Sequence, residues 1–335
     1  MKELATRAPR NRTLVLADED AKRLRGRLMV VDRPTTMSDC IGRTILGDSF
    51  QVLPLLPRQC VDLLIVDPPY NLTKIFSDST FRRRSTGKYE DWIRSWISLV
   101  APLLKPSGAA YVCSEWRSSA AIQRVLEEYF VIQNRITWER EKGRGALRNW
   151  KNCSEDIWFC TLDNEYFFNV EAVKQKRRVI APYRDAKGKP KDWTEESNGD
   201  FRVTHPSNLW TDISVPFWSM PENTEHPTQK PEKLIAKLIL ANSRPGEIVL
   251  DPFLGSGTTS VVAKKLGRMF VGIEREKSYC LLAEKRLELA DFEPSIQGYA
   301  GGYFWERNTL ALQGAQKTDK NGGSTVQLQL FENQS

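Results

Sequence analysis

The alternation of hydrophobic and polar positions changes period along the chain and predicts strands that alternate with helices. Short apolar runs rich in β-branched residues predict strands at 61–66, 109–113, 131–138, 156–161, 247–250 and 269–273. Apolar residues at helical spacing predict helices at 92–103, 120–129, 231–244, 256–266 and 278–289. This order predicts an α/β fold, in which a mostly parallel sheet carries helices on both faces.

Three segments depart from the regular pattern. Residues 1–37 are rich in Arg and Lys and weakly periodic, so we expect an N-terminal extension. Residues 165–220 are polar, basic and rich in Pro, Asn and Trp, which indicates a segment inserted into a main domain at 38–290. Residues 291–335 end in a polar, Gly-containing stretch, and we expect a partly disordered C-terminal tail.

Composition narrows the classes of function. The 335 residues are 40% hydrophobic and 27% charged, as in soluble globular proteins. There is no apolar run of about 18 residues and no apolar N-terminal segment, so we expect a cytoplasmic protein with no membrane partner. The six Cys form no CxxC pair and the chain has only two His, so we expect no metal site.

Basic residues are concentrated in two clusters, within a chain of net charge +7. The first is Arg82, Arg83 and Arg84 with Lys88, and the second has eight basic residues opposed only by Asp185. The members of the second cluster are Lys174, Lys176, Arg177, Arg178, Arg184, Lys187, Lys189 and Lys191. A solvated surface explains such runs, but they also suit a polyanionic partner.

A strand, a glycine turn and a helix follow one another at Glu247–Thr259. Gly255 and Gly257 permit positive φ and close approach of a ligand to the backbone, and the helix N-terminus offers free N–H groups. Glu274 ends the next strand 19 positions after Gly255, where it can accept hydrogen bonds from both ribose hydroxyls of a nucleoside. Ser260 stands where the dinucleotide fingerprint has its third glycine, so an ordinary strand–helix turn is the alternative.

The other residues of this turn bear on the class of ligand. Asp251 and the bulky Phe253 and Leu254 leave little room to wrap a pyrophosphate. They suit a nucleoside that carries an amino-acid tail, and S-adenosylmethionine is a ligand of that kind.

A second turn, Asp67-Pro68-Pro69-Tyr70, ends a buried strand and suits chemistry on a nucleobase amine. The lone pair of such an amine is delocalised into the ring, which makes the nitrogen a poor nucleophile. The Asp67 carboxylate and the Pro68 carbonyl can accept its two N–H bonds and direct the lone pair at a methyl group. Pro69 stiffens the turn, and Tyr70 offers an aromatic face to an extruded base. The alternative is a proline-rich turn with a buried tyrosine.

These features resemble the β class of S-adenosylmethionine-dependent DNA amino-methyltransferases. Asp67–Tyr70 matches the catalytic motif of that family, and Asp251–Thr259 matches its cofactor motif. His226–Pro231 matches the segment that lines the methionine end of the cofactor. The catalytic motif precedes the cofactor motif, as in the β class, and the resemblance covers residues 38–290.

The resemblance implies a Rossmann-like, seven-stranded sheet with circularly permuted motif order and target recognition within 165–220. It implies cofactor contacts at Asp48, His226, Thr228, Lys230, Asp251, Phe253, Gly255, Ser256, Gly257, Thr258 and Glu274. His226 is alternatively a helix cap, and Lys230 is either a partner of the methionine carboxylate or a solvated side chain. DNA contacts are expected at Arg82, Arg83, Arg84, Lys88, Lys174, Lys176, Arg177, Arg178, Lys187, Lys189 and Lys191.

The sequence therefore predicts a DNA adenine-N6 methyltransferase that flips its target base out of the duplex, because the catalytic motif begins with Asp rather than Ser. The alternatives are methylation of cytosine N4, of RNA or of a protein Gln, and a catalytically silent DNA-binding relative. No Cys follows the two prolines, which argues against C5-cytosine chemistry. We expect double-stranded DNA as the partner, with a homodimer and a cognate restriction endonuclease as further possibilities. All of this requires Asp67 and the glycine turn to face one pocket.

Overall fold

The computed structural model describes residues 8–76, 79–140, 147–180, 183–197, 199–307, 309 and 313. Within these residues one sheet has eight strands, and five of its seven neighbouring pairs are parallel. Their order is β1 (Arg43–Leu46), β13 (Met269–Glu274), β12 (Ile248–Asp251), β2 (Val61–Val66), β5 (Leu104–Glu115), β7 (Ser154–Thr161), β6 (Val131–Glu139) and β11 (Leu209–Trp210). The expected count of seven strands is wrong by one, because β11, from the inserted segment 165–220, pairs with β6.

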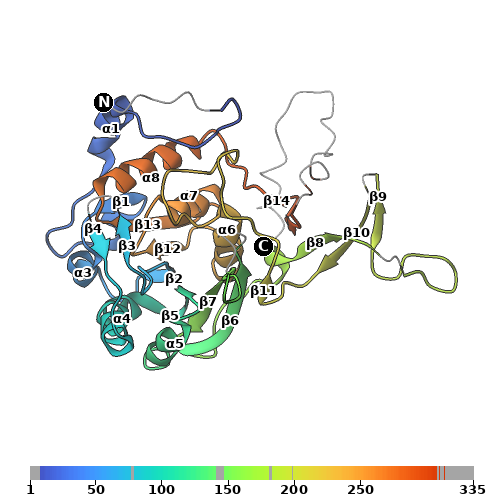
Figure 1. Ribbon diagram of the computed structural model, residues 1–335, viewed down its shortest axis with the longest axis horizontal. Coiled ribbons are helices and arrows are strands. Elements are labelled where there is room, and N and C mark those ends of the chain that lie inside the picture. Colours follow the sequence, from blue (N-terminus) through green and yellow to red (C-terminus); the bar gives the residue numbers. More distant parts are fainter. Residues whose placement is uncertain are drawn as a thin grey trace.

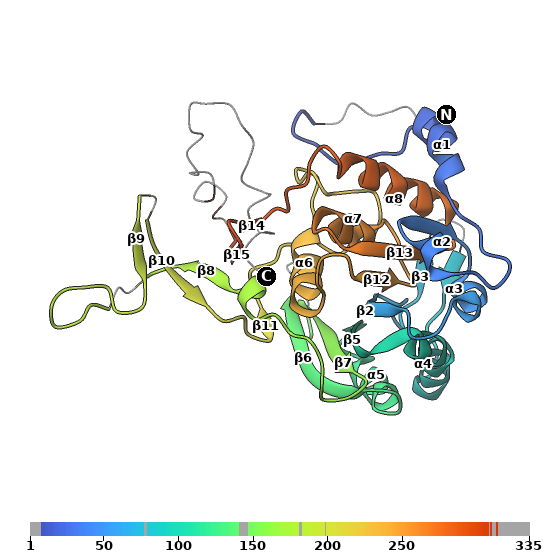
Figure 2. The ribbon, with the colours of Figure 1, turned by 180° about the vertical axis from the view of Figure 1, so that it is seen from behind.

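Helices cover both faces of this sheet, as the sequence predicts (Figures 1 and 2). One face carries α6 (Glu232–Asn242), α7 (Thr258–Lys265) and α8 (Lys277–Leu289). The other carries α4 (Thr86–Val100) and α5 (Ser119–Leu126).

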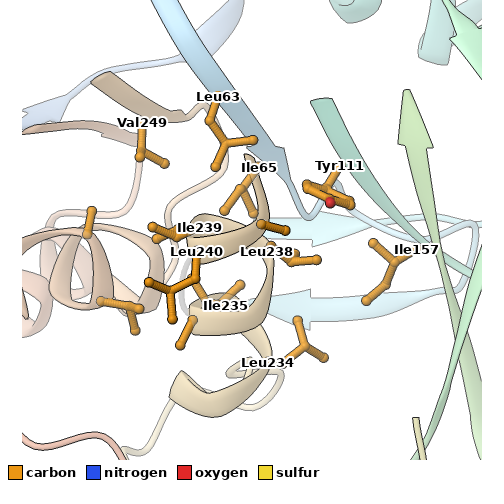
Figure 3. Close-up of a cluster of buried hydrophobic side chains, with 14 of the residues drawn as sticks. Leu63, Ile65, Tyr111, Ile157, Leu234, Ile235, Leu238, Ile239, Leu240 and Val249 are labelled. Atoms are coloured by element: carbon orange, nitrogen blue, oxygen red, sulfur yellow. The ribbon is translucent and has the colours of Figure 1, made fainter. Parts of the chain in front are cut away.

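Strand β2 shows why two helical layers are needed. Leu63 and Ile65 pack in the cluster with α6 (Figure 3), whereas Leu64 and Val66 pack in the cluster with α4. Successive side chains of a strand point to opposite faces, so a continuous apolar run is stable only when both faces are covered.

Short elements complete this layer structure. The short helices are α1 (Asp18–Leu24), α2 (Met37–Cys40) and α3 (Ser49–Val52), with 3-10 turns η1 (Arg25–Arg27), η2 (Leu53–Leu55), η3 (Ala101–Leu103) and η4 (Glu171–Val173). A hairpin of β3 (Lys74–Phe76) and β4 (Ser79–Phe81) lies between β2 and α4 in the chain. Among the described residues, no helix is long and apolar enough to cross a membrane.

A second sheet is built from the inserted segment 165–220 and from residues 299–305. Its order is β14 (Tyr299–Ala300), β15 (Tyr303–Trp305), β8 (Gln175–Arg178), β10 (Gly199–Thr204) and β9 (Thr194–Glu196). In Figures 1 and 2, β8, β10 and β9 extend away from the large sheet, and we call residues 175–204 the arm. The segment 291–307 thus contributes strands, and the expected disorder beyond residue 313 falls outside the described residues.

Two local expectations need correction or addition. Strand β5 begins at Leu104 rather than Ala109, because a bulge accommodates Pro106 and Gly108 between the pairs Val61–Leu104 and Leu63–Ala109. The N-terminal segment lies against the main body: α1 packs on α8, and Arg23 pairs with Glu288. The proposed domain boundaries remain a prediction.

Candidate active site

A cavity of about 370 Å³ lies where the carboxyl ends of β2, β12 and β13 meet. Asp67, Pro68, Pro69 and Tyr70, which follow β2, line one part of it. The turn after β12 lines another part through Phe253, Gly255, Ser256 and Thr258. The two turns, far apart in the chain, therefore face one pocket, as the sequence predicts. Parallel strands bring this about, because their carboxyl ends share one edge of the sheet.

The backbone carbonyls of the Asp67–Tyr70 turn differ in their hydrogen bonding. The Tyr89 hydroxyl, from α4, donates to the Pro69 carbonyl over 3.1 Å and anchors the turn. Among the described residues, no hydrogen bond ends on the carbonyl of Pro68, and this residue lines the pocket. The Pro68 carbonyl is thus available to accept an N–H bond from a ligand, as the sequence predicts.

The Asp67 carboxylate is the centre of a buried polar network. Tyr70 donates its hydroxyl to Asp67 Oδ1 at 2.9 Å, and Lys230 Nζ donates to Asp67 Oδ2 at 2.6 Å. Glu155, at the start of β7, completes the network: its Oε2 lies 3.1 Å from the Tyr70 hydroxyl and 3.3 Å from Lys230 Nζ. Arg140, beyond the end of β6, pairs with Glu155 Oε1 at 2.6 Å. Two cations thus balance two carboxylates.

Burial and charge set the protonation of this network. Burial alone would lower the pKa of Lys230, but the carboxylates of Asp67 and Glu155 outweigh that effect and raise the pKa above its usual value. Burial raises the pKa of Tyr70 far above its usual range, and the same two carboxylates add to the effect. At neutral pH the network therefore contains an ammonium group and a neutral phenol.

The glycine turn needs its two glycines for different reasons. Gly255 has φ of +56°, and a Cβ there would lie 3.0 Å from Nε2 of His226. Gly257 has φ of +86° and precedes α7; a Cβ there would lie 2.5 Å from Cβ of Ala283, on α8. The first glycine permits the segment of His226 to close on the turn, and the second permits α7 and α8 to pack together.

Two acids hold the shape of the glycine turn. Asp251 accepts from the backbone N–H of Phe253 at 2.9 Å and from the Thr259 hydroxyl at 2.6 Å. Glu274 accepts from the backbone N–H groups of Gly255 and Glu276, both at 2.8 Å. Burial raises the pKa of Asp251 to about 7 although its two hydrogen bonds oppose the shift, and burial also raises the pKa of Glu274.

The remaining predicted cofactor residues surround the same cavity. Asp48 lines it and caps α3 through the backbone N–H of Phe50, at 2.9 Å. The His226 ring meets the Tyr279 ring edge-to-face at 4.5 Å, and the backbone N–H of Thr228 donates to His226 Nδ1 at 3.3 Å.

Aromatic side chains from α4 form a wall near Phe253. The Trp96 ring meets the Phe253 ring edge-to-face at 5.8 Å, and Trp92 lies 6.4 Å from Phe253. Trp92 and Phe81 both line the cavity. An apolar wall with polar groups at both ends suits a ligand that is aromatic at one end and charged at the other.

Comparison with known proteins identifies this arrangement. Residues 61–285 match the model of the N6/N4 methyltransferase family, described as DNA methylase. The chain belongs to this family of DNA methylases.

Curated relatives resemble the methylase over most of both chains. The DNA adenine methyltransferase YhdJ of Escherichia coli is 34% identical over 264 residues, which is 77% of this chain and 86% of the relative. The type II methyltransferase M.HpaI of Haemophilus parainfluenzae is 33% identical over 251 residues, 73% of this chain and 74% of the relative.

Solved structures share the fold. The cytosine-N4-specific PvuII DNA methyltransferase has a TM-score of 0.51 at 18% identity, over 75% of this chain and 92% of its own. The protein TTHA0409 of Thermus thermophilus, crystallised with S-adenosyl-L-methionine, has a TM-score of 0.50 at 22% identity, over 79% and 96% of the chains.

The predicted DNA contacts of the first basic cluster lie close to the pocket. Arg84 lines the cavity, and its guanidinium lies over the rings of Phe81 and Trp92, 5.2 Å and 5.7 Å from their centroids. Arg82, Arg83 and Lys88 are exposed on the same segment, up to the first turn of α4.

The second basic cluster is partly neutralised by acids that lie outside it in the sequence. Lys176 pairs with Glu196 at 2.6 Å and lies over the rings of Phe201 and Trp305, so it helps to hold the arm together. The other pairs with acids are Lys174–Glu171, Arg177–Glu306 and Arg184–Glu195. Arg178, Lys187, Lys189 and Lys191 are exposed or partly exposed and form no ion pair with another described residue.

Sequence reasoning missed Glu155, which lines the pocket, and Arg286, which supports the glycine turn. Glu155 lies near the start of β7, just before an apolar run, and a buried charge within a strand is the signal that could have found it. Arg286, on α8, donates to the Ser256 carbonyl and the Thr258 hydroxyl, both at 2.9 Å, and pairs with Glu232. Nothing in the local pattern of α8 distinguishes this arginine from a solvated one.

Proposed function

We propose that the methylase is a site-specific DNA adenine-N6 methyltransferase that uses S-adenosylmethionine. The observation that carries the proposal is the single pocket shared by the Asp67 turn and the glycine turn. A methyl group can pass directly between a donor at one turn and a base at the other only when both open into the same cavity.

The residues of the pocket fit S-adenosylmethionine. Its volume of about 370 Å³ lies in the range of small-molecule sites. We assign Glu274 to the ribose hydroxyls, Phe253 and Asp48 to the adenine end, and His226 and Thr228 to the methionine end. Ser256, Gly257 and Thr258 supply the helix N-terminus, and Asp251 fixes the turn through its two hydrogen bonds. Bound there, the cofactor supplies a methyl group on a positively charged sulfur.

The catalytic turn prepares the amine for attack. Asp67 accepts one N–H bond and the Pro68 carbonyl the other, so the nitrogen lone pair turns out of the plane of the base. Both oxygens of Asp67 already accept hydrogen bonds, but each carboxylate oxygen has a second lone pair that can receive the amine. The ring of Tyr70 provides a face on which the flipped base stacks.

Adenine is the preferred target for two reasons. The catalytic motif begins with Asp67, and a relative that is 34% identical is named a DNA adenine methyltransferase. Cytosine N4 carries the same kind of amine, so the nature of the product distinguishes the two possibilities.

Analysis of the product tests this proposal. The purified protein is incubated with unmethylated genomic DNA and labelled S-adenosylmethionine, and the DNA is digested to nucleosides and weighed by mass spectrometry. The proposal predicts N6-methyladenine at one recurrent sequence, which single-molecule sequencing of the same DNA then maps. N4-methylcytosine as the only product would reject the assignment of adenine, and no labelled nucleoside at all would favour a silent DNA-binding protein.

We propose that the methylase binds double-stranded DNA, and we assign two of its surfaces to contacts with the duplex. The segment with Arg82, Arg83 and Arg84 contacts phosphates beside the flipped nucleotide, and the exposed lysines of the arm follow the duplex further away. A homodimer and a cognate restriction endonuclease remain predictions.

A further inference from the structure

The hydroxyl of Tyr70 lies between two carboxylates that come from distant parts of the chain. It is 2.9 Å from Asp67 Oδ1 and 3.1 Å from Glu155 Oε2. A single phenol hydrogen can be donated to only one of them at a time. The arrangement is therefore a bridge that can exist in two hydrogen-bonded states.

The surroundings keep this bridge in place. The side chains of Glu155 and Lys230 are 5% and 8% exposed and that of Asp67 is 23% exposed, so the Glu155 side of the bridge is shielded from water while the Asp67 side opens to the cavity. Lys230 contacts Asp67, Glu155 and the Tyr70 oxygen, and Arg140 fixes the other oxygen of Glu155. Glu155 and Tyr70 both line the cavity, so the bridge borders the space assigned to the target base.

We propose that Tyr70 and Glu155 form a proton relay that removes from Asp67 the proton released by the target amine. The inference rests on the proposed methyl transfer to an exocyclic amine and holds for adenine or cytosine. The relay assigns to Glu155 the role of final proton acceptor, and the proposed methyl transfer gives this residue no other role.

The relay accounts for every proton and electron pair. The N–C bond forms as the methyl group leaves the sulfonium sulfur, which keeps the bonding electron pair. As that bond forms, positive charge develops on the nitrogen and makes it strongly acidic, so in the same step one N–H proton passes to Asp67 Oδ1. Tyr70 takes this proton on its oxygen and gives its own hydrogen to Glu155 Oε2. Asp67 is again a carboxylate, and Glu155 returns the proton to water in the cavity after the product leaves.

Two conservative substitutions test the relay. Tyr70→Phe keeps the ring that stacks on the base but removes the hydroxyl, and Glu155→Gln keeps the size of the side chain but removes the proton acceptor. Single-turnover methyl transfer is measured with labelled S-adenosylmethionine on a duplex that carries the mapped site. We expect each variant to lose at least about 10-fold in rate, since positioned proton-transfer groups contribute that much or more. Equilibrium binding of S-adenosylmethionine should stay unchanged.

Two further readouts separate a relay from a structural role. The wild-type rate should fall in D₂O, and Tyr70→Phe should lose that isotope effect. The double variant should be no slower than the slower single variant, because residues that act in one pathway are not additive. Thermal unfolding checks that Glu155→Gln folds; if it does not, Tyr70→Phe and its isotope effect decide alone.

Glu115 provides a matched control. It lies opposite Glu155 in the register of β5 and β7, is 5% exposed, and bonds to Arg117 and Ser118. Glu115→Gln should transfer at the wild-type rate. A Tyr70→Phe variant that matches wild type, or losses that multiply in the double variant, would overturn the relay. An inactive wild type would instead count against the proposed function.

Discussion

At the scale of single residues, we expect the backbone conformation of Gly255 to affect ligand binding. Its φ of +56° disfavours any side chain, and an added Cβ would lie 3.0 Å from Nε2 of His226. Gly255→Ala therefore has to strain the backbone by about 1–2 kcal/mol and displace the histidine. We expect the affinity for S-adenosylmethionine, measured by calorimetry, to fall by about 10-fold or more.

Gly87 is the matched control for this substitution. It lies in α4, has no positive φ, and has no atom within 4 Å of an added Cβ. Gly87→Ala should leave cofactor affinity unchanged and stabilise the helix by up to about 1 kcal/mol. Equal cofactor affinity in Gly255→Ala and the wild type would show that the turn does not hold the ligand.

The raised pKa of Asp251 predicts how stability depends on pH. Burial raises this pKa from 3.8 to about 7, so the folded state holds the proton more tightly than the unfolded state. The free energy of unfolding should therefore decrease as the pH rises from about 4 to about 7, by an amount on the order of 4 kcal/mol for this group, and level off above that.

Urea unfolding of wild type and Asp251→Asn at several pH values tests this expectation. The variant is less stable at low pH, because an amide cannot accept from both Phe253 and Thr259 in the way the acid does. Its stability should nevertheless depend less on pH than that of the wild type. Identical pH slopes for the two proteins would mean that Asp251 is ionised throughout this range.

At the scale of elements, Arg286 connects α8 to the glycine turn and to α6. Its guanidinium bonds to Ser256 and Thr258 and pairs with the buried Glu232. Arg286→Met leaves Glu232 with only Lys265 as a partner among the described side chains, and breaking such a buried pair costs about 3–5 kcal/mol. We expect a lower free energy of unfolding in urea together with weaker binding of S-adenosylmethionine.

Arg244 is a suitable comparison for Arg286. Its side chain is 59% exposed and pairs with Glu247 three residues away. Arg244→Met should change stability by less than about 1 kcal/mol and leave cofactor binding intact. If Arg286→Met behaved in the same way, α8 would have no part in shaping the turn.

The elements that sequence patterns predict well are those with local signals. Strand β2 begins and ends where its apolar run does, and α6, α7, β13 and α8 agree with the expected ranges to within a few residues. The catalytic and glycine turns are recognisable for the same reason, since each places its special residues within a few positions of a strand end. The common edge of parallel strands then brings them together.

Other elements depend on partners that lie far away in the chain. Strand β8 pairs with β15, about 130 residues later. The sequence alone suggests that Lys176 contacts DNA, but in the fold its ammonium lies over Trp305 and pairs with Glu196. Glu155 is in the site because β7 runs antiparallel to β5, an orientation that periodicity does not reveal. Long-range pairing and antiparallel orientation are thus what the sequence pattern leaves open.

At the scale of the whole molecule, we expect the arm and the pocket to divide the recognition of DNA. Lys187, Lys189 and Lys191 are exposed on the arm and form no ion pair with another described residue. Replacing all three with Gln should weaken binding of duplex DNA and lower the slope of log affinity against log salt, by up to about 0.9 for each phosphate that the arm no longer neutralises. Fluorescence titration at several salt concentrations measures both effects.

Lys176 lies on the same arm, but we expect its substitution to affect stability rather than DNA binding. Because its ammonium pairs with Glu196 and lies over Phe201, Lys176→Met should destabilise the second sheet without changing the salt slope. If the triple substitution left the slope unchanged, the arm would not follow the phosphate backbone.

We assign methyl transfer to the Asp67 turn and cofactor binding to the glycine turn, and a substitution of Asp67 tests this division most directly. Asp67→Asn keeps the shape of the side chain, so binding of S-adenosylmethionine and of the mapped duplex should stay within about 3-fold of wild type. Single-turnover formation of N6-methyladenine should fall by about 100- to 1000-fold, because an amide does not stabilise the charge that develops on the amine. A variant that binds both ligands and methylates at the wild-type rate would contradict the assignment of Asp67 and of the pocket as the place of methyl transfer.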